Sequence, residues 1–338
     1  MTRTDVTVLG AGLAGSEAAW QLARRGWRVA LWEMRPAVMT PAHRTGRFAE
    51  LVCSNSLKSE APASAPYLLK EELRHLGSLL LRVADGCRVP AGQALAVDRQ
   101  RFAESVEAAV RSEAGIAVVS AEARTLPAAR PVIVATGPLT SPALAEALRG
   151  LAGAEHLFFY DAISPIVAGA SVDRAVAFAA SRYGKGGDDY LNCPLNRKEY
   201  QAFIEALRAA DTYPRHDFEA DAYFEGCLPI EEIVRRGDDT LRFGPMKPVG
   251  LVDPRTGTVP YAALQLRRED VLGDAFNLVG FQTRLRQGEQ QRVFRLIPGL
   301  ARAEFIRFGQ IHRNTYLNAP AVLNPEQEFR DHPGVFAA

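Results

Sequence analysis

A glycine-rich turn near the N-terminus restricts the fold more than any other feature. The predicted secondary structure around it is a strand over 6–9, a helix over 13–25 and a second strand over 28–33. A strand, a helix and a strand in this order, joined by G-x-G-x-x-G, predict a βαβ unit that binds a dinucleotide. The motif residues, all assigned to the cofactor site, are Gly10, Ala11, Gly12, Leu13, Ala14 and Gly15.

Each glycine of the motif has a physical role in holding a pyrophosphate. Gly10 is expected to make the tight turn, and Gly12 to let the backbone approach the phosphates. Gly15 is expected to let the helix pack closely on the strand, so that the helix N-terminus faces the phosphates. Glu33 ends the second strand at roughly the 20-residue spacing at which an acid accepts hydrogen bonds from ribose hydroxyls.

The motif alone does not distinguish NAD from FAD, but the sequence that follows it favours FAD. An NAD-binding half would continue into another regular βα unit, whereas here Met34 and Arg35 lead into a long irregular stretch over 40–64. Loops of this length inside a compact domain are usually functional. An apolar segment over 131–137 then ends in Ala-Thr-Gly, which resembles flavoproteins with two dinucleotide-binding domains. Met34, Arg35 and Gly137 are therefore also assigned to the FAD site.

The pattern predicts an α/β fold, in which a two-dinucleotide-binding, Rossmann-like FAD domain carries an inserted α+β substrate domain. The FAD domain is expected to take residues 1–140 and a return strand over 325–338, with the inserted domain over 141–324. Within the inserted domain the turn-bounded segments predict a helix over 200–210 and strands over 240–243, 262–266 and 276–280.

Charge and cysteine content set the broad class of protein. The chain has 40 Lys and Arg against 39 Asp and Glu, so its net charge is no sign of a polyanionic partner. Its four cysteines show neither a CxxC pair nor zinc spacing, and we expect no metal site and a reduced, cytoplasmic protein. Asp5 argues against a signal peptide, and no apolar run reaches the roughly 20 residues of a membrane span. We expect no membrane partner, and the sequence sets no oligomeric state.

The irregular stretch over 40–64 and a later segment each carry a cysteine in an unusual setting. Cys53 follows a histidine and two arginines, and a cysteine reacts as its thiolate, which nearby cations favour. Cys227 follows a glycine and lies near acidic residues. By composition alone, both would be interpreted as buried structural cysteines.

Long stretches beyond the glycine motif make the chain resemble one family over nearly its whole length, the bacterial folate- and FAD-dependent tRNA uracil-C5 methyltransferases (TrmFO, formerly Gid). The stretches that carry this resemblance are 33–36, 40–58, 92–99, 135–141, 190–194, 223–229, 243–255 and 312–320.

The resemblance implies a reaction and two catalytic cysteines. Members of this family take a methylene from 5,10-methylenetetrahydrofolate, pass it through the flavin and place it as a methyl on C5 of the T-loop uridine, tRNA position 54. NAD(P)H reduces their FAD. Uracil C5 is a poor nucleophile until a thiolate adds at C6, and a base must then remove the C5 proton. The resemblance implies Cys227 as the nucleophile and Cys53 as its partner in proton transfer, and these two roles could be reversed.

The resemblance also implies folate and RNA contacts. His312 matches the histidine that stacks on the folate pterin, and Arg313 and Asn314 are expected to hydrogen-bond the pterin or its glutamate. The target uridine must leave the T-loop stack to react, with the tRNA phosphates held by cations near the cleft. The cations expected there are Arg44, Arg47, Lys58 and Lys247.

Two departures from the family pattern keep alternatives open. Gln287 stands where the family usually has an aromatic residue, before Glu289-Gln290. Family members also continue with a Gly-rich segment that completes the flavin site, whereas here the expected last strand ends at Ala338. The alternatives are a related tRNA-modifying flavoprotein that acts on another substrate, such as a wobble uridine, or a truncated, non-catalytic remnant.

Overall fold

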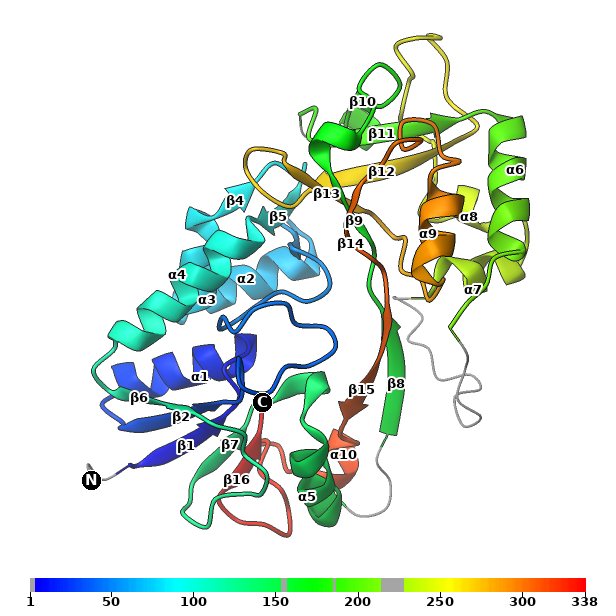
Figure 1. The fold of residues 1–338 in the computed structure, drawn as a ribbon. Helices are drawn as coiled ribbons and strands as arrows, with labels where there is room; N and C mark the ends of the chain where they lie inside the picture. The colour runs from blue at the N-terminus through cyan, green and yellow to red at the C-terminus, as the bar shows by residue number, and fades with distance from the viewer. Residues whose placement is uncertain (1–3, 153–156, 185–186, 214–227) are drawn as a thin grey trace.

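Two sheets of different kinds divide the molecule (Figure 1). The computed structural model describes residues 4–152, 157–184, 187–213 and 228–338. One sheet has five strands in the order β16-β7-β1-β2-β6, and the other has six in the order β10-β11-β12-β13-β9-β14. A two-stranded ribbon of β8 (Leu157–Ala162) and β15 (Ile311–Tyr316) runs between the two parts (Figure 1).

The five-stranded sheet is parallel at every pairing, as the βαβ prediction requires. Successive residues of its first strand face opposite sides, so Val8 packs toward one core and Leu9 toward the other. Leu144 and Leu148 belong to this second core. The strands are β1 (Val6–Leu9), β2 (Val29–Glu33), β6 (Ile116–Ser120), β7 (Val132–Val134) and β16 (Val335–Ala337), and the helices of this part are α1 (Leu13–Arg24), α3 (Leu79–Gly86), α4 (Arg99–Ser112), α5 (Pro142–Ala152) and α10 (Ala319–Val322).

A small antiparallel sheet lies beside these helices and corrects one expectation. It has the order β3-β5-β4, and Figure 1 labels β4 and β5 on the cyan ribbon, with α2 (Ala65–His75) close by. Its strands are β3 (Ser56–Ser59), β4 (Arg88–Val89) and β5 (Ala94–Val97). The prediction that 40–64 is irregular throughout is therefore wrong over 56–59. The segment Ser-Leu-Lys-Ser is an irregular edge strand, which does not need the apolar alternation by which buried strands are recognised.

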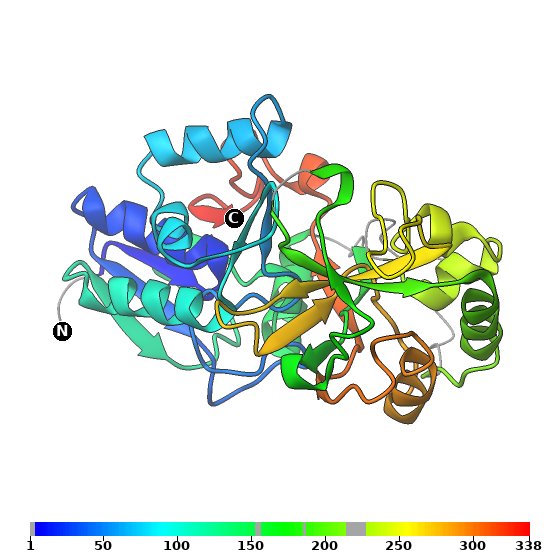
Figure 2. The same cartoon turned by 90° about the horizontal axis from the view of Figure 1, so that it is seen from above.

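The six-stranded sheet is antiparallel and carries the second large core. Phe281, which follows β13, packs between Phe203 of α6 and Phe294 of α9. The ring centroids of Phe203 and Phe281 lie 6.0 Å apart, and those of Phe281 and Phe294 lie 5.7 Å apart. Figure 2 shows this part beside the parallel sheet. Its strands are β9 (Ile166–Ala168), β10 (Phe178–Ala179), β11 (Tyr190–Leu195), β12 (Ala262–Arg268), β13 (Ala275–Leu278) and β14 (Phe305–Arg307), and its helices are α6 (Arg197–Arg208), α7 (Ile230–Arg235), α8 (Thr240–Phe243) and α9 (Gln287–Phe294). Three single turns, η1 (Gly137–Leu139), η2 (Gly169–Ser171) and η3 (Arg182–Gly184), complete the described elements.

The strand expected over 240–243 is wrong, because this segment is the short helix α8. Thr240 Oγ1 donates to the carbonyl oxygens of Ile233 and Gly237, at 2.7 and 2.6 Å, which joins α8 to the end of α7. Leu241 is fully buried in the core. A four-residue segment with one buried apolar residue has too little periodicity to separate a helix from a strand. None of the helices in the described ranges combines the length and apolar character needed to cross a membrane.

Candidate functional site

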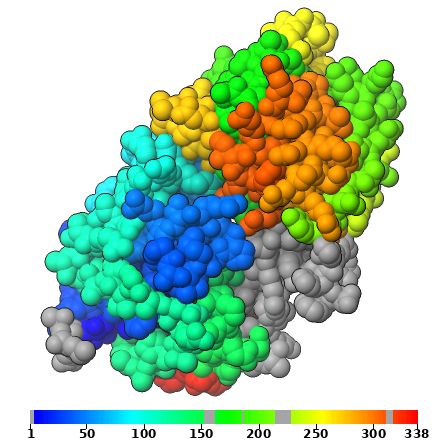
Figure 3. Space-filling view, in the orientation of Figure 1, coloured from blue at the N-terminus to red at the C-terminus, as the bar shows by residue number. Residues whose placement is uncertain are grey.

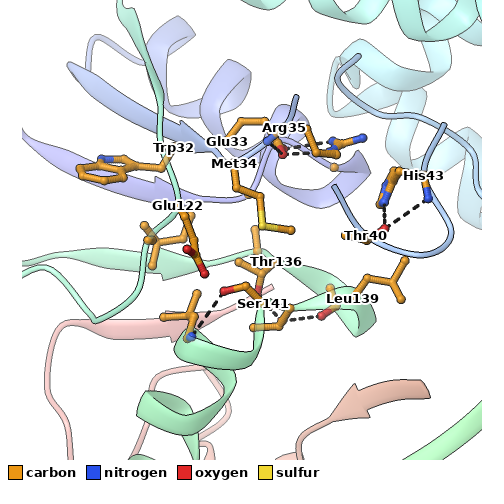
Figure 4. A pocket seen from close by; sticks show the side chains of 18 of the residues that line it. Trp32, Glu33, Met34, Arg35, Thr40, His43, Glu122, Thr136, Leu139 and Ser141 are labelled. Atoms are coloured by element: carbon orange, nitrogen blue, oxygen red, sulfur yellow. Dashed lines mark hydrogen bonds and ion pairs between the residues drawn. The ribbon is translucent and has the colours of Figure 1, made fainter. Parts of the chain in front are cut away.

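A cavity of about 300 Å³ opens where β1, β2 and β7 end (Figure 4). Ligands of parallel α/β sheets bind at the carboxyl ends of the strands, so this is the expected place for a dinucleotide. Its walls come from the residues that follow those three strands, from residues 121–123 after β6, and from Thr40, His43, Glu50 and Val52 in the long loop after β2. The predicted cofactor residues that line it are Gly10, Gly12, Leu13, Ala14, Glu33, Met34, Arg35 and Gly137.

The three motif glycines meet different surroundings. Gly10 has a φ of +92°, and a Cβ atom there would lie 2.8 Å from the carbonyl oxygen of Ala135. A Cβ atom on Gly15 would lie 1.8 Å from the carbonyl oxygen of Gly10. A Cβ atom on Gly12 would meet no protein atom within 4 Å and would project beside the cavity that this residue lines. Gly10 and Gly15 therefore build the turn, and Gly12 leaves space for a ligand.

Glu33 ties the glycine turn to Arg35. One carboxylate oxygen accepts a hydrogen bond from the N–H of Ala11 at 2.9 Å, and the other accepts from Nε of Arg35 at 2.9 Å. Burial opposes ionisation of this carboxyl, but the hydrogen bonds and charge of Arg35, with the Ala11 N–H, outweigh it and lower the pKa of Glu33. Glu33 is thus a buried carboxylate that fixes the motif, and a contact of Glu33 with ribose stays a prediction.

Arg35 lines the cavity with a guanidinium group that has one nitrogen without a hydrogen bond among the described residues. Its side chain is buried, and within the described part of the chain its Nη1 makes no hydrogen bond. Nη1 lies 3.6 Å from Oε2 of Glu50, an ion pair without a hydrogen bond. A buried N–H group without an acceptor is costly, and a phosphate is a strong acceptor. The donor set and the open space beside Gly12 therefore fit a dinucleotide.

His43 lines the same cavity, and no specific role for it followed from the sequence (Figure 4). Its Nδ1 lies 2.6 Å from Oγ1 of Thr40. Burial and the charge of Arg35 lower the pKa of His43 to about 4, so the ring is neutral at pH 7. Side chains such as Trp32, Glu122 and Thr136 also line the cavity, and only the folded chain brings them together.

The cysteine loop, defined as residues 41–55, lies next to this cavity and holds the half-buried Cys53. Arg99 binds the loop backbone: its guanidinium donates to the carbonyl oxygen of Leu51 and, at 3.2 Å, to that of Cys53. Nε of Arg99 in turn donates to Oε2 of Glu269 at 2.8 Å. The N-terminal end of α4 is therefore joined to Cys53 on one side and to the antiparallel sheet on the other.

Two arginines of the antiparallel sheet hold the same loop from the far side. Arg267 donates to Oδ1 of Asn55 at 2.8 Å and to Oγ of Ser54 at 2.9 Å. Arg307 donates to the carbonyl oxygen of Ala42 at 2.9 Å. Burial lowers the pKa of both arginines, that of Arg307 to about 10. Figure 3 shows the blue surface of the early chain meeting the orange surface of the antiparallel part.

The remaining predicted catalytic and folate residues are placed only in part. Cys227 lies outside the described residues. His312, Arg313 and Asn314 belong to β15, whose backbone pairs with β8. The β15 backbone also lies against η1, the turn at the cavity wall that contains Gly137. Their side chains, like Cys227, are not among the described parts.

The four cations predicted to hold RNA do not form one cluster. Arg44 is exposed beside His43. Arg47 turns toward α4 and pairs with Glu107 at 3.2 Å. Lys58 lines a separate cavity next to β3, and Lys247 lies half-buried in the loop after α8.

A family model and individual relatives match nearly the whole chain. A sequence model of the family described as glucose inhibited division protein A matches residues 5–338. The chain is 58% identical to the methylenetetrahydrofolate–tRNA (uracil-5-)-methyltransferase TrmFO of Moorella thermoacetica, covering 98% of this chain and 76% of that protein. It is 59% identical to the protein of the same name from Rubrobacter xylanophilus, covering 97% of this chain and 73% of that protein.

Solved structures of other proteins have a fold similar to that of this chain. GidA from Aquifex aeolicus superposes with a TM-score of 0.72 and 16% identity, and a second crystal form gives 0.71. The first comparison covers 99% of this chain, which spans 59% of the GidA chain. At this identity the likeness concerns the fold alone, and it agrees with the parallel sheet.

Proposed function

The chain belongs to the glucose inhibited division protein A family, and from this membership we propose that it methylates C5 of the T-loop uridine at position 54 of tRNA. The methyl carbon comes from 5,10-methylenetetrahydrofolate, and NAD(P)H is the reductant. The observation that carries the proposal is the 56–59% identity to the TrmFO proteins over nearly the whole chain. We place the reaction in the cytoplasm, where tRNA is modified.

FAD is the cofactor that the cavity at the ends of β1, β2 and β7 would hold. The glycine turn at Gly10 and Gly12 would bind its pyrophosphate, helped by Arg35, whose Nη1 lacks a hydrogen bond within the described ranges. When bound, FAD supplies the electrons that convert the methylene carbon to a methyl group. Glu33 keeps the turn and Arg35 in place, and the neutral His43 adds no charge beside the cofactor.

The two cysteines would activate the uracil. A thiolate that adds to C6 makes C5 nucleophilic, and a base then removes the C5 proton. We assign the addition to Cys227 and the proton transfer to Cys53, with the reverse assignment as the alternative. Arg99, through the backbone of Cys53, and Arg267, through Ser54 and Asn55, hold positive charge at this loop, which favours a thiolate.

Folate and RNA would approach from neighbouring surfaces. We propose that His312 stacks on the pterin, with Arg313 and Asn314 as its polar partners. The closeness of the β15 backbone to η1 supports this, since η1 forms a wall of the FAD cavity. Among the cations, Arg44 and Lys58 are exposed and suited to tRNA phosphates, whereas Arg47 already pairs with acidic residues on α4.

The decisive experiment is a methyl-transfer assay on the purified chain supplied with FAD. An unmodified tRNA transcript, methylenetetrahydrofolate carrying a labelled methylene carbon, and NADH or NADPH should give labelled 5-methyluridine at position 54. A transcript with cytidine at that position is the matched control and should stay unlabelled. In Cys227→Ala and in Cys53→Ala, the rate of 5-methyluridine formation should fall by about 1,000-fold or more, as expected for a residue that bonds to or deprotonates the substrate. Full activity of Cys227→Ala would overturn the mechanism.

A further inference from the structure

A second cavity, of about 350 Å³, lies between the small sheet and the start of β11. We call it the β3–β11 cavity. No aspartate or glutamate is among the described residues that line it, although two cations and several hydroxyl groups do. Its polar lining includes Ser56, Lys58, Ser59, Gln93, Arg182 and Tyr190.

Among the described residues, Arg182 has no carboxylate partner at this cavity. Its Nη2 donates to the carbonyl oxygen of Pro245 at 3.2 Å, while its Nε is buried and, among the described residues, has no acceptor. Burial lowers the pKa of Arg182, and the groups that oppose this are the hydroxyls of Tyr183 and Tyr190. A partly buried cation of this kind is normally paired, and the described residues of the lining supply no anion for it.

The backbone around the β3–β11 cavity is strained in two places. Lys58 has a φ of +71° and Tyr183, next to Arg182, has a φ of +62°. Residues other than glycine rarely adopt this conformation, and when they do they cluster at ligand sites. Asp189 lines an adjoining cavity, and its Oδ2 accepts a hydrogen bond from the N–H of Gly92 at 2.7 Å.

We propose that the β3–β11 cavity binds a phosphate of the RNA backbone through Lys58 and Arg182. A phosphodiester carries the missing charge, and its oxygens accept from guanidinium, ammonium and hydroxyl groups alike. The RNA source of the phosphate rests on the proposed action on tRNA, whereas the anion site itself does not.

The position of the cavity along the chain supports the RNA source. Val52 lines the FAD cavity and Ser56 lines the β3–β11 cavity, with Cys53 between them. Four residues span at most roughly 14 Å, so the two cavities are close neighbours along this segment. One RNA strand can therefore place a base near Cys53 while a flanking phosphate sits beside Lys58.

The test uses a near-isosteric change that puts a carboxylate into the cavity. Gln93 is exposed and lines the cavity, so Gln93→Glu should fold normally and supply Arg182 and Lys58 with an internal anion. Gln201→Glu adds the same charge at an exposed position on α6 and serves as the matched control. Lys58→Gln, also at an exposed position, removes one of the two cations.

Three measurements on the full chain with FAD bound decide the proposal. Binding of a tRNA transcript should weaken about tenfold in Gln93→Glu, and in Lys58→Gln the slope of log affinity against log salt should fall by about one. Inorganic phosphate at constant ionic strength should raise the Tm of the wild type and of Gln201→Glu, but not that of Gln93→Glu. The KM for NAD(P)H in flavin reduction should be the same in Gln93→Glu and Lys58→Gln as in the wild type.

Each contrary result has a distinct meaning. Equal tRNA affinity in Gln93→Glu and Gln201→Glu would overturn the proposal. A changed KM for NAD(P)H with unchanged tRNA binding would assign the phosphate to the nicotinamide dinucleotide and overturn the RNA source. If the wild type does not methylate tRNA but the phosphate-dependent rise in Tm and its loss in Gln93→Glu hold, the proposed function fails while the anion site is supported.

Discussion

The FAD cavity and the cysteine loop are neighbours, yet they are built in different ways. The cavity is formed at the ends of three adjacent parallel strands, and its central hydrogen bonds join residues 10–35. The cysteine loop is held by Arg267 and Arg307, which come more than 200 residues later in the chain. The hydrogen bonds at the centre of the first site therefore depend on one local motif, whereas the second site also depends on how the antiparallel sheet docks against the parallel part. Changes that damage one without the other test this difference.

The largest effect is expected from Gly15→Ala, which attacks the local motif. Its Cβ atom would lie 1.8 Å from the carbonyl oxygen of Gly10, so α1 must move away from β1. We expect the free energy of unfolding to fall by about 3 kcal/mol, at the upper end of the usual cost of overpacking. FAD should also be lost. Urea unfolding and the flavin absorbance that remains after gel filtration measure the two effects.

Gly12→Ala is the matched control for that change. A Cβ atom on Gly12 meets no protein atom within 4 Å, so the fold should stay as stable as the wild type. The same methyl group projects beside the cavity, and we expect weaker FAD binding without unfolding. If Gly15→Ala proved as stable as Gly12→Ala, close packing of the helix on the turn would not be what the motif provides.

The same contrast explains how much the sequence could predict. The spacing of glycines, apolar residues and an acid predicted β1, α1 and β2 almost residue by residue, since each depends on near neighbours. Arg267 and Arg307 carry no motif, and nothing in one sequence shows that their guanidinium groups reach Asn55 and Ala42. The helix over 240–243 was missed for a related reason, because burial of Leu241 in the tertiary core decides its conformation.

An intermediate effect is expected from Arg267→Met, which attacks the non-local clamp. Methionine keeps much of the length and apolar surface but leaves Oδ1 of Asn55 and Oγ of Ser54 without this donor. The free energy of unfolding should fall by about 2 kcal/mol, in line with the loss of hydrogen bonds to a charged group. Methyl transfer should fall roughly 100-fold, because a small displacement of Cys53 disturbs the reacting geometry. FAD retention should match the wild type.

Arg268→Met controls for the loss of one positive charge on the same strand. Successive residues of a strand face opposite sides, so the side chain of Arg268 points away from that of Arg267. This variant should keep most of its methyl-transfer activity, as measured by kcat at saturating tRNA. Equal losses in Arg267→Met and Arg268→Met would mean that charge, and not the clamp on the cysteine loop, matters.

The smallest effect is a pH dependence at His43, which belongs to both regions because it lines the cavity and lies in the cysteine loop. The pKa of His43 is lowered to about 4 by burial and by the charge of Arg35, against about 6.5 in an unfolded chain. Between these values the unfolded chain binds a proton that the folded chain does not, so stability falls as the pH drops from about 6.5 to about 4. His43→Asn keeps a polar group near Oγ1 of Thr40 but cannot titrate. Urea unfolding at pH 7 and pH 5 should show a smaller loss of stability in His43→Asn than in the wild type. An equal loss would mean that the folded protein protonates His43 as easily as the unfolded chain does, and that this segment is more open to solvent than the rest of the cavity wall.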